Sequence, residues 1–218
     1  MSDVRRLLGS KLWLLAVPAL APLFIPEALA FPHHRRIGDT DVYAERPIPS
    51  EMEGVLARAD DLVRASAIRG PGHGRRVFLT AGGWRWRWLA LTSPGAFGVT
   101  RPLSEAIVVN RSDPAADVVR NGRPIGGART LSGVIAHERA HGLIRARYGL
   151  FADRLHPAWL VEGYCDAVAQ ESSLSDAEAA GLERKGRSHP ALVYHQGRRR
   201  VEAMLRANGG SVDRLFEP

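Results

Sequence analysis

The strongest signal in this sequence is the stretch Leu131-Ser-Gly-Val-Ile-Ala-His137-Glu138-Arg139-Ala140-His141-Gly142. Residues four apart on a helix project from one face about one turn apart, so His137 and His141 can reach a single ion. Glu138 lies about 100° round the helix axis from His137, given about 3.6 residues per turn. Its carboxylate then lies beside the ion and can hold a metal-bound water. The motif His-Glu-x-x-His therefore predicts a zinc site on a helix over residues 131–148.

A second helix is expected at about residues 157–172, because Pro157 suits the first turn of a helix. Glu162 and Asp166 lie four apart on one face of it. A short connection after the motif helix lets the two helices pack together, so that Glu162 supplies a third metal ligand. Asp166 could then accept a hydrogen bond from the non-ligating ring nitrogen of a metal histidine. The alternative is a solvated acidic face, but the residues around the pair are too apolar for a fully solvated helix.

These two segments together resemble the gluzincin metallopeptidases, the group that includes the thermolysin-like and aminopeptidase N-like families. The resemblance rests on His137-Glu138-x-x-His141 and Trp159-Leu160-x-Glu162-Gly163. Asp166 stands at the position where the family has a residue that supports a metal ligand without binding the metal itself. It covers roughly residues 100–172 directly, and the segment before it fits the family's N-terminal lobe. The resemblance implies a zincin-like fold in which His137, His141 and Glu162 bind zinc and Glu138 is the general base.

The same resemblance implies hydrolysis of a peptide or protein substrate. Zinc would activate a water molecule, and Glu138 would accept its proton and pass it to the leaving nitrogen. We expect the substrate to lie extended along an edge strand, for which Ala106–Asn110 is the candidate. Related families stabilise the oxyanion with a tyrosine or histidine on a later helix, and Tyr194 or His195 is the nearest match. A packed aromatic beside an exposed histidine explains that pair equally well.

The rest of the chain predicts an α+β fold, with a small mixed β-sheet lobe followed by a helical lobe. A loop is expected at 31–41, a strand near 42–48, and a helix from Ser50 to about Ile68 with a Ser50/Glu53 capping box. Short strands are expected at 77–80, 84–91, 97–100 and 106–110 between Gly and Pro turns. Further helices are expected at about 175–186, where Ser175 and Glu178 form a capping box, and at 190–207.

Residues Trp84 to Trp88 read Trp-Arg-Trp-Arg-Trp, an alternation with the period of a β-strand. We interpret it as an amphipathic strand whose tryptophan face packs on a helix. The functional alternatives are base stacking or contact with an anionic membrane surface.

Residues 1–30 have the order of a secretory signal: Arg5, Arg6 and Lys11, an apolar run, and small residues at Ala28 and Ala30. This predicts a mature domain at 31–218, exported to the periplasm or the exterior. The alternative is an uncleaved anchor, with membrane attachment through residues 12–30 and the domain facing outward. A third interpretation is an apolar helix docked on the domain.

The amino-acid composition limits the number of domains, the kinds of partner and the kinds of metal site that this chain can have. A chain of 218 residues with 45% hydrophobic content can bury the core of one domain. Its net charge of +7 comes from basic residues of which only Lys11 and Lys185 are lysines, and the arginines are scattered through the expected elements. This scatter argues against a nucleic-acid partner. Cys165 is the single cysteine, which excludes an intramolecular disulfide and a multi-cysteine zinc cage.

Three functions remain on the sequence alone. The first is an exported zinc metallopeptidase. The second is an exported domain that zinc stabilises without catalysis. The third is a basic surface-binding module that uses the Trp84–Trp88 segment. The importance of Glu138 for an activity separates the first from the second, and copurification of zinc separates the first from the third.

Overall fold

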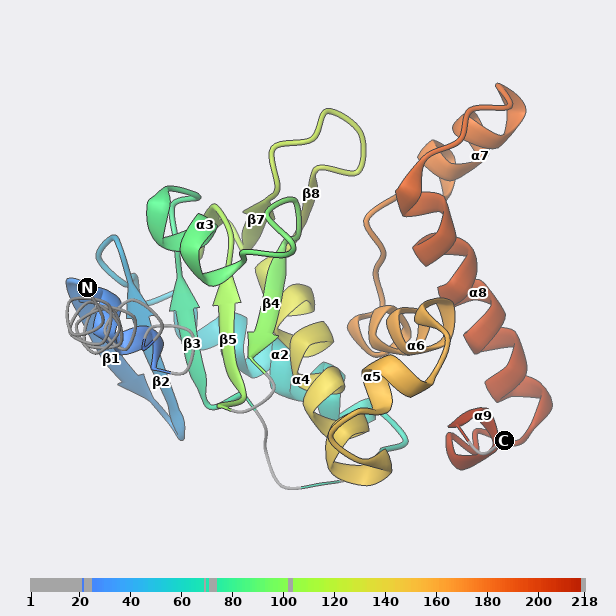
Figure 1. Cartoon of the computed structure of the whole chain (residues 1–218), viewed down its shortest axis with the longest axis horizontal. Helices are drawn as coiled ribbons and strands as arrows, with labels where there is room; N and C mark the ends of the chain where they lie inside the picture. The colour runs from blue at the N-terminus through green and yellow to red at the C-terminus, as the bar shows by residue number, and fades with distance from the viewer. Residues whose placement is uncertain (1–20, 22–24, 69, 71–73, 102–103, 217–218) are drawn as a thin grey trace, which may run out of the picture.

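The computed structural model describes residues 21, 25–68, 70, 74–101 and 104–216. The N-terminal part of the chain forms a β-sheet with helices on both of its faces, and the C-terminal part is helical (Figure 1). This mixed architecture agrees with the α+β class expected from the sequence.

The main sheet has five strands in the order β1-β2-β3-β5-β4. Strand β3 lies parallel to both β2 and β5, while β1 and β4 pair antiparallel with β2 and β5, so the sheet is mixed. Strand β5 has four fully buried apolar residues, as an internal strand requires, and β4 forms the edge. The strands are β1 (His33–Ile37), β2 (Thr40–Ala44), β3 (Arg76–Leu79), β4 (Gly98–Arg101) and β5 (Ala106–Val109).

Helices cover both faces of this sheet because its central strands are apolar on both sides. Val77 and Leu79 of β3 pack into one core cluster, and Phe78 between them packs into another, as the pleat of a strand demands. The elements on the first face are α2 (Met52–Ala65) and α4 (Leu131–Tyr148), and those on the second are α3 (Trp84–Leu89) and the short 3-10 helix η2 (Pro26–Leu29).

A small antiparallel sheet leads directly into α4. Thr130, the last residue of this sheet, caps the helix by accepting a hydrogen bond from the Gly133 backbone N–H. Asp117 holds the same end, because its carboxylate accepts hydrogen bonds from the backbone N–H and the hydroxyl of Ser132. The strands of this sheet are β6 (Ser112–Asp113), β7 (Val118–Arg120) and β8 (Ala128–Thr130).

The helical part packs on the other side of α4, on the right in Figure 1. Its core joins apolar residues of α4, α6 and α8, including Ile144, Tyr164 and Val201. A Cβ atom built on Gly163 would lie 2.5 Å from the backbone carbonyl carbon of Gly197, so the two helices approach this closely because both residues are glycine. The helices are α5 (Ala152–Leu155), α6 (Ala158–Ala169), α7 (Asp176–Arg184), α8 (Pro190–Ala207) and α9 (Asp213–Phe216).

Several local expectations are confirmed. The motif helix spans residues 131–148 and α8 spans 190–207, both with the expected ends. The Ser175/Glu178 capping box is present at the start of α7. The expected helices near 157–172 and 175–186 are shorter by one to three residues at their ends.

Other expectations near the N-terminus are wrong. The expected loop at 31–41 contains strand β1, which forms a hairpin with β2 around Gly38, a glycine with a φ of 58°. The Ser50/Glu53 capping box is absent, since Glu53 pairs with Arg35 instead and α2 begins without a side-chain cap. An ion pair formed across the fold has therefore replaced the local hydrogen bond.

The Trp84–Trp88 segment is a helix and not a strand. Trp86, Leu89 and Ala90 are buried against the sheet, at the spacing of one helical face, while Trp84 and Trp88 are exposed. Arg85 donates to the carbonyls of Leu29 and Ala30, which ties α3 to η2. The period-2 alternation misled the prediction because the helical spacing of the apolar residues was present as well.

Most of the segment interpreted as a signal or anchor, residues 1–20 and 22–24, lies outside the described residues. The end of it packs on the domain: Leu29 is buried among residues of α3 and the sheet, and Glu27 pairs with Arg76 at 3.0 Å. Within the part of the chain that the structure describes, no helix has both the length and the apolar character needed to cross a bilayer.

Candidate metal centre and cleft

The structure brings together the three side chains expected to be metal ligands. His137 and His141 project from one face of α4, with ring centroids 5.1 Å apart. Glu162 reaches them from α6, which packs against α4. One carboxylate oxygen of Glu162 lies 3.4 Å from Nε2 of His137, and the other lies 3.7 Å from Nε2 of His141.

These spacings are close to those between the ligands of a tetrahedral metal site. Ligand atoms placed tetrahedrally at about 2.0–2.1 Å from an ion are separated by about 3.3 Å. One Glu162 oxygen is close to that separation from His137, and the other oxygen is slightly farther than that from His141. Nε2 of each ring faces the Glu162 carboxylate. The other ring nitrogen, Nδ1, faces Asp166 in His137 and Asp153 in His141. The residues present therefore fit a metal ion held by two histidines and a glutamate.

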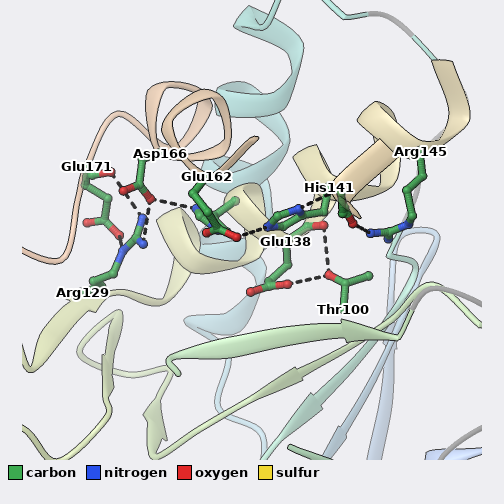
Figure 2. Close-up of polar contacts among 10 residues, drawn as sticks. Thr100, Arg129, Glu138, His141, Arg145, Glu162, Asp166 and Glu171 are labelled. Carbon is green, nitrogen blue, oxygen red and sulfur yellow. Dashed lines mark hydrogen bonds and ion pairs between the residues drawn. The ribbon is translucent and has the colours of Figure 1, made fainter. Parts of the chain in front are cut away.

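A chain of charged groups supports His137 from behind. The Asp166 carboxylate lies 2.8 Å from Nδ1 of His137, and Arg129 holds the same carboxylate at 2.9 Å. Glu171 accepts a hydrogen bond from Arg129 in turn, as Figure 2 shows. Burial alone would raise the pKa of the Asp166 carboxyl, but Arg129 and the hydrogen bond to His137 hold that pKa below its usual range. Asp166 is therefore ionised and fixes the orientation of the imidazole.

His141 has a similar support from the opposite side. Its Nδ1 lies 3.4 Å from a carboxylate oxygen of Asp153 on α5. Arg145, one turn further along α4, holds the other oxygen of Asp153 at 2.7 Å and also binds Glu105 after strand β4. Asp153 escaped prediction because α5 was expected to be a plain connection.

The acidic neighbours of the two imidazoles raise the pKa of both rings. Burial alone would lower the pKa of His137, but hydrogen bonds to Asp166 and Glu162 outweigh it and raise the pKa to about 10. Burial lowers the pKa of His141 too, but the hydrogen bond to Asp153 and the charges of Glu162 and Glu138 together outweigh burial and raise that pKa. A divalent cation bound by these imidazoles would have to displace the protons from their ligating nitrogens.

Glu138 lies beside this cluster and faces the edge strand β4. The hydroxyl of Thr100 lies 2.6 Å from a carboxylate oxygen of Glu138 and 3.0 Å from its backbone carbonyl (Figure 2). A Cβ atom on Gly98 would lie 3.1 Å from the other carboxylate oxygen, so the glycine makes room for the Glu138 side chain. The edge strand beside the site is thus β4, and the prediction that Ala106–Asn110 would be that edge is wrong.

Cys165 also belongs to this cluster. Ligand atoms of His137, His141 and Cys165 lie within 4.8 Å of one another, and this group could hold a metal ion. The thiol is fully buried, and burial raises its pKa well above the ordinary value. Its position three residues after Glu162, on the same face of the helix, was the signal that it would lie beside the histidines.

The two candidates for the oxyanion donor, Tyr194 and His195, lie in different surroundings. Tyr194 lines the same cleft as Glu138 and Glu162, and the pKa of its phenol is raised by partial burial and by the charge of Glu162, so it keeps its proton. His195 is buried and directed elsewhere, with Nε2 2.8 Å from Asp176. Of the pair, only Tyr194 is placed where it could contact a substrate.

The cluster lies in a cleft of about 750 Å³. One wall is strand β4 with the loop before it, and the opposite wall comes from α5, α6 and the start of α8. The loop between β7 and β8 closes one end, and α4 forms the floor with His137, Glu138 and His141. The cleft therefore has the dimensions of a small-ligand or peptide site with a cluster of metal-binding groups at its base.

None of the protein-family models, curated proteins or solved structures compared with this chain matches it.

Proposed function

We propose that this protein is a zinc-dependent metallopeptidase of the gluzincin type with a zincin-like fold. The observation that carries the proposal is the convergence of Glu162 with both histidines, its oxygens 3.4 Å and 3.7 Å from the two Nε2 atoms. Two imidazoles and one carboxylate suit zinc better than calcium or magnesium, and three protein ligands leave a position for catalysis.

A zinc ion bound by these residues would polarise a peptide carbonyl and acidify water at neutral pH. Glu138 is positioned to accept the proton of the attacking water and to donate it to the leaving nitrogen. The hydroxyl of Thr100 orients that carboxylate. The phenol of Tyr194, on the far wall, is the candidate donor to the developing oxyanion.

The substrate would bind as an additional strand on β4. In the described sheet, β4 pairs with β5 on one side, and its other edge borders the cleft. An extended peptide on this edge gains main-chain hydrogen bonds, and its scissile bond is brought next to Glu138. The substrate class is therefore a peptide or an unfolded segment of a protein.

Metal content and activity test this proposal together. The purified protein should contain one zinc per chain. Its hydrolysis of an unfolded protein substrate should stop after chelation and return when zinc is restored. A protein that copurifies with zinc and cleaves no peptide under any condition would favour a zinc-stabilised domain without catalysis.

We also propose that the domain is exported, because residues 1–30 have the order of a secretory signal. Cleavage after Ala30 would remove the Glu27 ion pair and the buried Leu29 side chain from the domain. N-terminal sequencing of protein from its native cells tests this proposal. A start at Phe31 in the exported fraction supports cleavage, and a start at Met1 or Ser2 in the membrane fraction supports the anchor. The same start in the cytosol contradicts both.

A further inference from the structure

We infer that the cleft selects peptides with acidic side chains on both sides of the bond at the metal centre. This inference rests on the proposed function for its account of where a peptide lies. The observation that motivates it is independent of catalysis: two arginines, Arg123 and Arg154, line the cleft at its two ends.

Arg123 stands at the end of the cleft where β4 begins. It belongs to the loop between β7 and β8, and its guanidinium would lie 2.9 Å from a Cβ atom on Gly95, in the loop before β4. Its charge also acts on Tyr194 across the cleft, where it opposes the raised pKa of the phenol. The guanidinium is therefore held near both walls of the cleft.

Arg154 stands toward the opposite end. It belongs to α5, next to Asp153, which Arg145 connects to Glu105 just beyond the end of β4. A peptide lying along β4 would pass Arg123 at one end, the Glu138 carboxylate in the middle and Arg154 at the other end. The two arginines thus belong to elements at opposite ends of β4, and we infer that they meet peptide positions on opposite sides of the reacting bond.

Most of the other acidic groups of the cleft face cationic or imidazole groups within the protein. Asp166 is held by Arg129, and Asp153 by Arg145. Glu162 faces the two histidines. By contrast, among the described residues neither Arg123 nor Arg154 has a carboxylate within ion-pair distance, and both are exposed. These two arginines are therefore positive charges that a ligand in the cleft can reach.

A ligand carboxylate can supply what these arginines lack. Guanidinium groups bind carboxylates with two parallel hydrogen bonds, and charge complementarity at a site favours the matching ligand over its opposite. Exposed ion pairs are weak, so each arginine should change selectivity by about two- to fivefold at low salt. The selectivity should fall as salt rises, because the screening length is about 10 Å at 0.1 M.

Three matched peptides test the inference. They share one apolar centre and carry Glu, Gln or Lys on both sides of it. For the zinc-loaded wild type, kcat/KM should decrease in the order Glu, Gln, Lys. Arg123→Gln and Arg154→Gln should each reduce the Glu-to-Lys ratio about two- to fivefold. Arg187→Gln makes the same charge change at an exposed residue outside the lining of the cleft, and should leave the ratio unchanged.

Binding to Glu138→Gln, measured by fluorescence anisotropy of the labelled peptides, separates this inference from the proposed activity. Cleavage of all three peptides at equal rates would overturn the acidic preference and leave the peptidase proposal intact. Binding in the order Glu, Gln, Lys that depends on the two arginines, with no cleavage by the wild type, would support the acidic site and contradict the peptidase. Absence of both binding and cleavage would contradict both.

Discussion

The carboxylate of Asp166 lies 2.8 Å from Nδ1 of His137, and Arg129 holds that carboxylate from the other side at 2.9 Å. The pair joins α6 to α4 at the base of the cleft. It leaves Nε2 of His137 as the nitrogen that faces Glu162. Asp166 thus fixes both the orientation of the ring and the nitrogen that is offered to a metal ion.

Asp166→Asn should weaken zinc binding about 10- to 100-fold, because an amide supports the imidazole less strongly than a carboxylate. Competition with a chromophoric chelator measures the affinity. Asp176→Asn, which removes the carboxylate beside His195 away from the cleft, is the matched control and should leave zinc affinity unchanged. Equal affinities for the wild type and the Asp166 variant would show that this hydrogen bond does not act on the metal.

Glu162 and Cys165 give opposite predictions for the third ligand. Glu162→Gln should reduce zinc affinity by at least about 100-fold. This loss is larger than the one expected for Asp166→Asn, because Asp166 only supports a ligand. Cys165→Ser should leave the affinity within a few fold of the wild type, because the buried thiol resists losing its proton. A large loss of zinc from the serine variant and a small one from the glutamine variant would assign the thiol as the ligand.

Zinc binding should release protons near neutral pH. Burial lowers the pKa of His137, but hydrogen bonds to Asp166 and Glu162 outweigh burial and raise the pKa from its ordinary value of about 6.5 to about 10, so the ring is protonated at pH 7 before zinc binds. The stability that this proton gives the metal-free protein is present below about pH 6.5 and is lost as the pH rises through about 10. Zinc needs the neutral ring, so its apparent affinity should rise with pH over that range.

Isothermal titration in two buffers of different ionisation enthalpy measures the released protons. Zinc binding at pH 7 that releases none would contradict a protonated His137 in the metal-free state. Asp166→Asn provides an internal comparison, because the loss of its charge lowers the pKa of His137 and should reduce the number of protons released.

The close crossing of α6 and α8 positions the residue next to it, Glu162. Gly163→Ala would place a methyl group against the Gly197 backbone, and we expect a loss of about 1–3 kcal/mol of stability with weaker zinc binding. Gly181→Ala is the matched control, since a Cβ atom there meets only the far end of Arg184 at 4.0 Å. It should be neutral or stabilise α7 by up to about 1 kcal/mol. Urea unfolding measures the free energy of unfolding of both variants. Equal values for the two variants would contradict the close crossing of α6 and α8.

The residues that sequence predicted best are those fixed by local spacing. The four-residue intervals between His137 and His141 and between Glu162 and Asp166 place each pair on one helical face whatever surrounds it. The ends of α4 follow from a cap at Thr130 and a glycine at position 149. Such features need no knowledge of the tertiary fold.

The residues that sequence could not find depend on contacts between distant segments. Thr100 meets Glu138, and Arg129 meets Asp166, only after the sheet and the helices have packed. The edge position of β4 is likewise a property of strand order, which a run of apolar residues at 106–109 does not specify. The Trp84 segment failed for a different reason, because its residues satisfy the periods of both a strand and a helix.

Glu138→Gln tests the central claim most directly. The substitution preserves the volume of the side chain and removes its ability to accept a proton, so folding and zinc content should stay close to those of the wild type. Hydrolysis of an unfolded protein substrate by the zinc-loaded variant should fall by about 10²- to 10⁴-fold, as the loss of a general base predicts. Cleavage at the wild-type rate by a variant that retains its zinc would contradict the account.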